Sequence, residues 1–105
     1  MPYLARAALG DAVIDAIQLL GTPTSVAILG ALMRSEPLTA HELEQQLDSS
    51  SNTLKRHLAE LRTAGLVLAE PIEDPDGRGS RLQFRIDRAE LTRQYRTLGA
   101  ALGLL

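Results

Sequence analysis

The 105-residue sequence has no cysteine and no tryptophan, and aromatic residues make up only 3% of it. Without cysteine, the chain can form no disulfide, no thiolate metal site and no thiol-based active site. Proteins that bind single strands stack bases on aromatic side chains, so the scarcity of aromatics argues against that mode of binding. The sequence therefore points away from redox, thiolate-metal and single-strand-binding functions.

Long apolar runs are also missing. A helix that spans a bilayer needs about 20 consecutive apolar residues, and no stretch of this chain reaches that length. The N-terminal stretch MPYLARAALGDAV is interrupted by charge and lacks the apolar core of a signal peptide. We therefore expect a cytoplasmic protein with no membrane partner.

The chain has little basic charge. Its net charge is −2, with 13 acidic and 11 basic residues, and Lys55 is its single lysine. Proteins that coat nucleic acid are usually strongly basic. If this protein binds DNA, its cations must be concentrated locally, and its non-specific affinity should be weak and sensitive to salt. The length and the 45% apolar content fit one domain covering residues 1–105 with an aliphatic core.

Glycine, proline and capping residues divide the first two thirds of the chain into four predicted helices. Thr22 and Ser50 are suitable N-caps, and Thr39 with Glu42 matches a capping box. Gly30, within the second helix, is expected to permit a close helix crossing. The expected helices cover about 4–20, 23–36, 40–47 and 51–64, with a turn at 48–50 and a left-handed C-terminal residue at Gly65.

After residue 65 the apolar period changes from 3.6 to 2. LVLAEPI (66–72) and RLQFRI (81–86) read as two strands around the turn EDPDGRGS, and Leu82, Phe84 and Ile86 should share one buried face. Asp87 then begins a last helix whose apolar stripe continues to Leu105. The predicted fold class is mainly α with a small β-hairpin, a winged helix-turn-helix of order α-α-α-α-β-β-α.

The helix that follows Ser50 begins with small polar residues and then carries two adjacent cations. A helix that enters the major groove needs hydrogen-bonding residues without bulk at its first turn, where Asn can pair with adenine and Arg or Lys with guanine. Polar residues also occur at the start of any capped helix, and a Lys-Arg pair can simply be solvated. The predicted DNA contacts are Ser50, Ser51, Asn52, Thr53, Lys55, Arg56, Arg62, Arg78 and Arg81.

The tip of the hairpin carries Arg78 between two glycines. Glycines let the backbone approach a groove, and a lone arginine suits contact with the minor groove or with phosphate. The opposing interpretation is a flexible polar turn, because Glu73, Asp74 and Asp76 would repel phosphate. We expect Arg78 to contact DNA and Arg81 to support it.

The stretch LTAHELEQQLDSSSNTLKRHLAELRTAGLV, residues 38–67, resembles the ArsR-like winged helix-turn-helix transcriptional regulators. The resemblance lies in the Leu-Thr lead-in, the Ser/Thr-rich start of the recognition helix, Arg56-His57-Leu58 and the exit Leu-Arg-x-Ala-Gly-Leu-Val. MarR-like and other winged families share much of this pattern. Ser49 departs from it, since the family usually has an apolar residue in the turn.

The resemblance implies a homodimeric repressor that reads a palindromic operator, and in many members also a metal sensor. The metal inference does not carry over, because the chain has no cysteine and only two histidines. His57 is expected to pack or to hydrogen-bond between helices, and His41 to be solvated. We predict no regulatory zinc site and no cofactor.

The terminal helices carry more apolar surface than a small winged core can cover. In the resembling family the first and last helices pair across a two-fold axis, which would place two recognition helices about 34 Å apart. The alternative is that the last helix folds back on its own domain. The predicted dimer contacts are Leu9, Val13, Leu91, Tyr95, Leu98 and Leu102.

The leading functional prediction is a sequence-specific, double-stranded DNA-binding transcriptional regulator, most plainly a repressor, with an unknown small-molecule or protein effector or none. The alternatives are a winged-helix protein–protein interaction module, which the acidic balance favours, and a small phage or plasmid DNA-handling protein. An enzyme is not expected. The sequence has no recognisable nucleophile motif, no carboxylate pair in an apolar setting and no phosphate loop.

Overall fold

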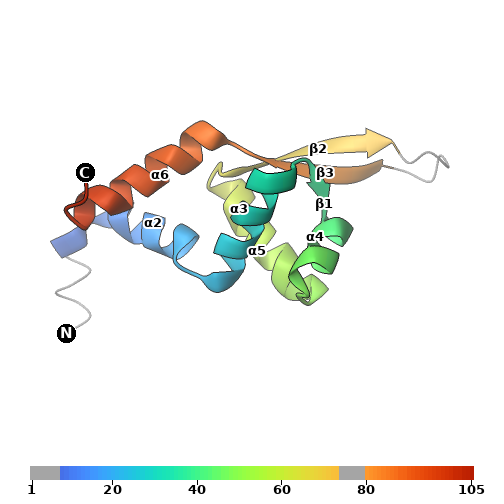
Figure 1. Cartoon of the computed structure of the whole chain (residues 1–105), viewed down its shortest axis with the longest axis horizontal. Coiled ribbons are helices and arrows are strands. Elements are labelled where there is room, and N and C mark those ends of the chain that lie inside the picture. Colours follow the sequence, from blue (N-terminus) through green and yellow to red (C-terminus); the bar gives the residue numbers. More distant parts are fainter. Residues whose placement is uncertain (1–7, 74–79) are drawn as a thin grey trace.

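The computed structural model describes residues 8–73 and 80–105, and in these residues five helices and three strands follow one another (Figure 1). The observed order agrees with the predicted winged helix-turn-helix and adds one short strand. The elements are α2 (Asp11–Leu20), α3 (Pro23–Ser35), β1 (Leu38–Thr39), α4 (Ala40–Leu47), α5 (Ser51–Thr63), β2 (Val67–Glu73), β3 (Ser80–Ile86) and α6 (Arg88–Ala101).

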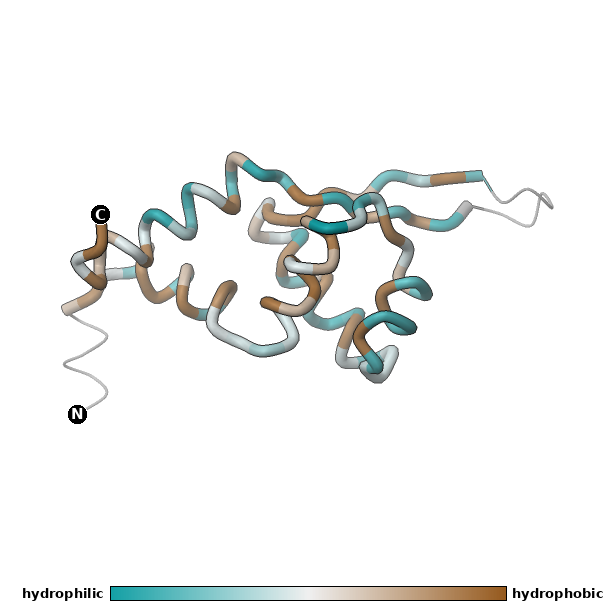
Figure 2. The backbone as a smooth tube through the Cα atoms, in the orientation of Figure 1, coloured by the Kyte–Doolittle hydropathy of each residue, from teal (hydrophilic) through white to brown (hydrophobic). Residues whose placement is uncertain are grey.

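The elements are arranged along one long direction. In Figure 1, α2 and α6 lie together at one end, α3, α4 and α5 form the middle, and the β2–β3 hairpin extends toward the other end. Figure 2 shows hydrophobic segments on the inner sides of the middle helices and also along α2 and the C-terminal end. α4 and the hairpin therefore lie away from the α2–α6 pair, whereas the C-terminal half of α5 borders it.

The hydrophobic core is aliphatic, as the composition predicted. α3 contributes Ile28, Leu29, Ala31 and Leu32, all buried, and it has more buried residues than any other described helix. Around it the core gathers leucines from α4 and α5 and the inward side chains of the sheet. The other members are Leu38, Leu43, Leu54, Leu58, Leu61, Leu66, Val67, Phe84 and Ile86.

The predicted helix caps are confirmed. The side chains of Thr22, Ser50 and Asp87 each accept a hydrogen bond from the backbone N–H three residues on. Thr39 and Glu42 form the full reciprocal capping box. Gly65 has a φ of +80°, and the N–H groups of Gly65 and Leu66 bond back to α5 in the pattern that closes many helices. Local sequence signals alone therefore set the boundaries of the helix-turn-helix.

The sheet has three antiparallel strands in the order β1-β3-β2, whereas the sequence predicted only a hairpin. Leu38 pairs with Phe84 and Thr39 with Gln83, so the start of the helix-turn-helix is hydrogen-bonded to the wing. A two-residue strand is too short to show the alternation that identifies strands in a sequence. The expectation of one buried face is only partly right, because Phe84 and Ile86 are buried but Leu82 is 41% exposed.

Both terminal helices are shorter than predicted. The helix expected from about Leu4 to Leu20 is interrupted at Gly10, whose φ is +80°, and α2 begins at Asp11. The last helix does not reach Leu105, because Gly103 adopts a φ of +79° and the N–H of Leu104 bonds back to Gly99. Each glycine takes the left-handed conformation that side chains disfavour, so the apolar pattern continues past the point where the helix ends.

In the described part of the chain, no single helix is long and apolar enough to cross a membrane. α2 and α3 together would meet the length and composition criteria, but they meet at 74°.

Glu36 connects the end of α3 to the last strand and the last helix. Its carboxylate accepts a hydrogen bond from the N–H of Ile86 at 2.7 Å and one from the guanidinium of Arg88 at 3.2 Å. These donors, the Ile86 N–H above all, hold the pKa of Glu36 below its ordinary value. The carboxylate is thus stabilised in its charged form at the junction between the winged domain and α6.

We expect Glu36→Gln to lower the free energy of unfolding by roughly 1 kcal/mol at neutral pH, because charge-assisted hydrogen bonds become neutral ones. Since folding lowers this pKa, the stabilisation is present near neutral pH and is lost as the pH falls below about 4.5. Urea unfolding at a series of pH values should show less acid destabilisation in the variant. Glu60→Gln, on the exposed side of α5, is the control; equal acid dependence in Glu36→Gln and wild type would contradict the assignment.

Candidate nucleic-acid interface

The recognition helix α5 is attached to the protein by one apolar row. Leu54, Leu58 and Leu61, spaced four and three residues apart, are 0–3% exposed and belong to the core. This spacing places them on one side of the helix. The side chains of Ser51, Asn52, Lys55, Arg56 and Arg62, which lie away from this row, are all exposed. The C-terminal half of α5 borders α2 and α6, with which it lines a depression.

The outward residues of α5 form two rows. At 3.6 residues per turn, Asn52 and Arg56 point most directly away from the buried leucines. Ser51, Lys55 and Arg62 lie along the edge of the helix that is turned toward the sheet, where Lys55 and Arg62 line a depression together with residues of β3. The adjacent cations Lys55 and Arg56 thus occupy different positions relative to the wing.

The hydroxyl groups at the start of α5 are not equivalent. Ser50 donates to the hydroxyl of Thr53 at 2.9 Å and accepts from the N–H of Thr53, so these two side chains are engaged in the cap. Thr53 is also half-buried, whereas Ser51 and Asn52 are exposed. Of the four small polar residues predicted to meet DNA, Ser51 and Asn52 are the more available.

The arginines divide into two groups. Arg85 of β3 pairs with Glu70, and on α6 Arg88 pairs with Glu36 and Arg93 with Glu90. In contrast, no carboxylate of the residues that the structure describes lies within 4.0 Å of the cationic groups of Lys55, Arg56 or Arg62. The cations of α5 are therefore available to an external anion, while several others are used inside the protein.

The depression between α5 and the wing, which we call the α5–β3 notch, has a volume of about 380 Å³. Its floor is apolar, formed by Leu58, Leu82 and Phe84, and its rim is cationic. The remaining lining residues are Thr39, Ala40, His41, Lys55, Ala59, Arg62 and Arg81. The guanidinium carbon of Arg62 lies 6.0 Å from the centre of the Phe84 ring, within the range of a cation–π contact.

Glu42 carries a negative charge near the cationic rim of the notch. Its pKa is lowered, first because the N–H of Thr39 donates to it and in smaller part because Arg81 and His41 are near. Glu42 does not line the notch, and its carboxylate is held by the N-cap of α4 at 3.0 Å. The notch therefore keeps a strongly positive rim despite this neighbour.

The two histidines lie where the sequence predicted. The Nδ1 atom of His57 is 3.3 Å from the hydroxyl oxygen of Ser25, so His57 joins α5 to α3. His41 is exposed in the first turn of α4. Within residues 8–73 and 80–105, no three histidine, aspartate or glutamate side chains come together as metal ligands, and the predicted lack of a zinc site stays a prediction.

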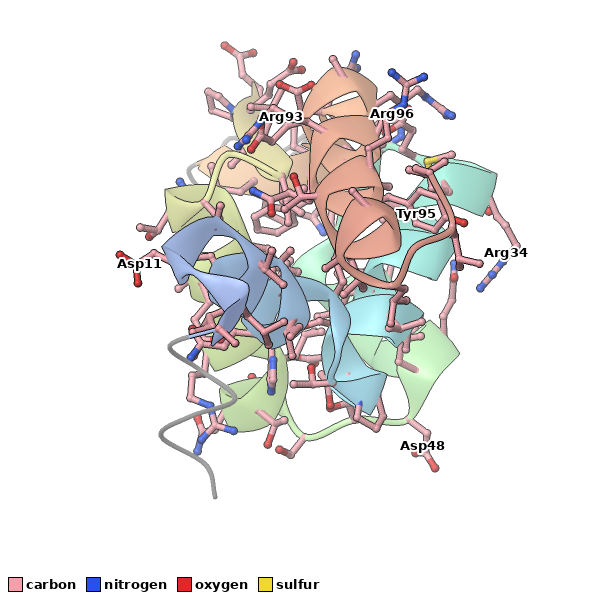
Figure 3. The ribbon with its side chains drawn as sticks, turned by 90° about the vertical axis from the view of Figure 1, so that its left-hand side faces the viewer. Asp11, Arg34, Asp48, Arg93, Tyr95 and Arg96 are labelled. Atoms are coloured by element: carbon pink, nitrogen blue, oxygen red, sulfur yellow. The ribbon has the colours of Figure 1, made fainter. Side chains whose placement is uncertain are left out.

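A second surface lies between α3 and α6. This groove, which we call the α3–α6 groove, has a volume of about 600 Å³ and is almost wholly apolar. In Figure 3, Tyr95 lies on the side of α6 that is turned toward Arg34 of α3, whereas Arg93 lies on the opposite side. It contains three predicted dimer residues, Leu91, Tyr95 and Leu98. The other lining residues are Leu20, Val26, Leu29, Gly30, Met33 and Thr92.

The other predicted dimer residues lie outside the α3–α6 groove. Leu102 is 66% exposed beyond the end of α6, Leu9 is exposed just before α2, and Val13 is half-buried on α2. Sequence reasoning did not find Val26 and Met33, although both are exposed apolar residues on α3. The signal that could have found them is the apolar character of residues 26–33 on most faces of the helix, which is more than one core can bury.

Two predicted features, at Arg78 and Gly30, differ from the expectation or lie outside the described residues. Arg78, the predicted contact at the tip of the wing, lies outside the described residues. Gly30 does not mark a close helix crossing, because a Cβ atom there would meet only the side chain of Arg34 within 4 Å. Gly30 instead faces the α3–α6 groove.

With this geometry established, comparison with known proteins identifies the fold. Residues 20–69 match the model of a family described as a helix-turn-helix domain. The structure of an ArsR-like transcriptional regulator from Rhodococcus sp. RHA1 is 27% identical, with a TM-score of 0.63 over 88% of this chain and 80% of that one. The chain therefore has a winged helix-turn-helix fold similar to that of ArsR-like transcriptional regulators.

Two other solved structures with a similar fold are also those of transcriptional regulators. A transcriptional regulator homologue from Pyrococcus horikoshii OT3 has a TM-score of 0.64 at 22% identity over 82% of each chain. The PcaV transcriptional regulator from Streptomyces coelicolor, solved with its natural ligand, has a TM-score of 0.56 at 25% identity over 78% of this chain and 55% of that one. No curated protein sequence matches this chain significantly.

The contact between Ser25 and His57 can be tested by a double-mutant cycle. We expect Ser25→Ala and His57→Phe each to lower the free energy of unfolding by about 1 kcal/mol, because the first leaves half-buried His57 and the second leaves buried Ser25 without its hydrogen bond. The double variant should be less destabilised than the sum of the two, with a coupling energy of about 1 kcal/mol in urea unfolding. Strict additivity would show that the two side chains do not interact.

Proposed function

We propose that this protein is a sequence-specific, double-stranded DNA-binding transcriptional regulator that acts as a homodimer. The observation that carries the proposal is the surface of α5, where the buried leucine row leaves Asn52, Lys55 and Arg56 outward. Their side chains have the donor and acceptor groups that read base edges. The similarity to solved transcriptional regulators supports the same function.

In this proposal α5 lies in the major groove. Asn52 and Arg56, which point most directly outward, contact base edges, and Ser51 and the free N–H groups of the first turn contact phosphate. Lys55 and Arg62, on the edge facing the sheet, reach the backbone that borders the groove, and the wing residues Arg78 and Arg81 add contacts beyond it. Ser50 and Thr53 contribute mainly by fixing the start of α5.

The proposed dimer uses the apolar surface of α2, α3 and α6. Tyr95 is 63% and Val26 is 55% exposed in the α3–α6 groove, an unusual exposure for side chains of this size in a single folded chain. A two-fold axis near this surface would present two copies of α5 to one face of a duplex, about 34 Å apart. Such a dimer would read a palindromic operator.

We infer that the regulator is a repressor, because a protein that occupies a promoter blocks it without needing a further surface to recruit other proteins.

The alternative of a protein–protein interaction module predicts a different response to salt. A DNA-binding regulator should lose affinity steeply as salt rises, whereas a protein-binding module should show little affinity for DNA at any salt concentration.

The groove assignment is tested by the double substitution Lys55→Ala/Arg56→Ala. We expect it to abolish binding to an operator selected from a pool of random duplexes, since one backbone contact and one base contact are lost together. Because both side chains are exposed, the melting temperature should change little. Fluorescence anisotropy with labelled duplex measures binding, and circular dichroism measures folding.

The matched control is Arg34→Ala/Arg96→Ala, which removes the same amount of charge from α3 and α6. Both arginines are exposed, and neither pairs with a carboxylate of the described residues. This control should bind the operator nearly as wild type does. Normal operator binding by Lys55→Ala/Arg56→Ala would place the DNA contact elsewhere.

The dimer surface is tested by Leu98→Glu and Tyr95→Glu. We expect each to convert the dimer to a monomer, because a carboxylate cannot be buried in an apolar interface without a partner. Light scattering coupled to size-exclusion chromatography measures the mass, and operator affinity should fall along with dimer formation. Tyr95→Glu is the cleaner variant, since Tyr95 is mostly exposed in the single chain.

Leu68→Glu provides the control for these variants. Leu68 is an exposed apolar residue of β2, outside the α3–α6 groove, so the same change there should leave the mass unchanged. A monomeric wild-type protein, or a Tyr95→Glu variant that is still dimeric, would contradict the proposed interface.

A further inference from the structure

The depression between α2, α5 and α6, which we call the α2–α5–α6 pocket, lies apart from the proposed DNA and dimer contacts. Asp15 lines it from α2, Glu60 from α5, and Glu90, Arg93 and Gln94 from α6. Arg93 and the dimer residue Tyr95 lie on opposite sides of α6 (Figure 3), so the pocket and the α3–α6 groove are different surfaces. Its volume of about 550 Å³ is within the range of sites that bind small organic molecules.

The charges around the α2–α5–α6 pocket are mainly negative. The guanidinium of Arg93 donates to both carboxylate oxygens of Glu90, and these bonds, followed by one from Gln94, hold the pKa of Glu90 below its ordinary value. Glu90 is thus ionised, but Arg93 compensates its charge. Asp15 and Glu60, in contrast, are exposed, and no cationic group of the described residues lies within 4.0 Å of either carboxylate. The pocket therefore carries two uncompensated negative charges, on two different helices.

Gln94 adds a buried hydrogen-bond acceptor to these charges. Only 7% of its surface is exposed, and its amide nitrogen donates to Glu90 at 3.1 Å. Its amide oxygen accepts no hydrogen bond from the described residues, in which every fully buried side-chain oxygen and nitrogen atom has a partner. The oxygen must therefore be accessible, and because Gln94 lines the pocket, it opens there. An amide oxygen in this situation can accept a hydrogen bond from an ammonium group.

The arrangement of the acceptors favours an extended cation over a metal ion. A divalent metal needs several oxygen ligands that converge on one point at about 2.0–2.6 Å. Among the residues that the structure describes, no three acidic or histidine side chains come together in that way. An organic cation with two charges can instead reach separate carboxylates. Its methylene chain would find apolar surface in the same pocket at Leu19, Ala59 and Ala64.

We propose that the α2–α5–α6 pocket binds a linear aliphatic diamine, with one ammonium group at Asp15, the other at Glu60, and the amide oxygen of Gln94 accepting a hydrogen bond from one of them. The ligand would then bridge α2 and α6 to the recognition helix.

The diamine also has a consequence for DNA binding, which rests on the proposed function. Glu60 lies about one turn after Arg56 on α5, so its uncompensated charge opposes the approach of phosphate. A bound diamine neutralises that charge and should raise the affinity for DNA. The diamine would therefore act as a co-repressor.

Binding is tested by isothermal titration calorimetry of the DNA-free protein with 1,5-diaminopentane. We expect saturable binding of one diamine per chain. Asp15→Asn and Glu60→Gln should each weaken it about tenfold, because each removes one charge-assisted hydrogen bond. Both side chains are exposed, so the variants should remain folded. 1-Aminopentane, which has a single ammonium group, should also bind about tenfold more weakly than the diamine.

Two controls distinguish the pocket from general attraction of cations to an acidic protein. Asp11→Asn removes an exposed carboxylate from α2 outside the pocket and should leave diamine binding unchanged. Mg²⁺ has the same charge as the diamine, and at equal concentration it should not displace it. If Asp11→Asn weakened binding as much as Asp15→Asn, or if Mg²⁺ competed equally, the attraction would be non-specific and the proposal would be overturned.

The effect on DNA is measured by fluorescence anisotropy with the selected operator. Diamines also bind DNA and compete with proteins for phosphate, so Asp15→Asn/Glu60→Gln serves as the reference in which only this competition remains. Relative to that variant, saturating 1,5-diaminopentane should raise the operator affinity of the wild type. Without diamine, Glu60→Gln should already bind the operator more tightly than the wild type does.

The outcomes separate this inference from the proposed function. If the wild type binds its operator but no diamine saturably, the pocket assignment is wrong and the proposed function stands. If the diamine binds through Asp15 and Glu60 but the protein binds no duplex at low salt, the proposed function is overturned and the pocket stands. If the diamine binds and changes operator affinity equally in the wild type and in Asp15→Asn/Glu60→Gln, the co-repressor role is overturned.

Discussion

The burial of one row of leucines on α5 determines what the rest of the surface can do. Leu54, Leu58 and Leu61 fix the rotation of the helix about its own axis, and that rotation directs Asn52 and Arg56 outward and Lys55 and Arg62 toward the wing. Each buried leucine contributes on the order of 2 kcal/mol through the apolar area removed from water. A turn of the helix by one residue would expose this row and bury charge, so the core and the binding surface specify the same orientation.

Charge is distributed so that folding and binding use different arginines. Arg85 of β3 and Arg88 and Arg93 of α6 are each paired with a carboxylate, while the cations of α5 have no such partner in the described part of the chain. A protein with a net charge of −2 can therefore still present a concentrated positive surface. Because that surface is small, sequence-independent attraction to DNA should be modest and readily screened by salt.

Features that depend on a few adjacent residues could be predicted from the sequence. Ser50, Thr39 and Gly65 signalled the ends of α4 and α5 through cap chemistry, and the period of the leucines identified the buried side of α5. Features that depend on distant residues could not. The strand β1 is two residues long and exists only because β3 lies beside it. The α5–β3 notch joins three separate segments, and the exposed apolar residues of α3 look in sequence like buried ones.

The pairing of Leu38 and Thr39 with β3 has a mechanical consequence. Through it, the segment that enters α4 and the strand that carries Arg81 share backbone hydrogen bonds, and Thr39 is at the same time the N-cap of α4. The wing and the helix-turn-helix are therefore joined through their backbones as well as through the core. A displacement of β3 would move Arg81 and the start of α4 together.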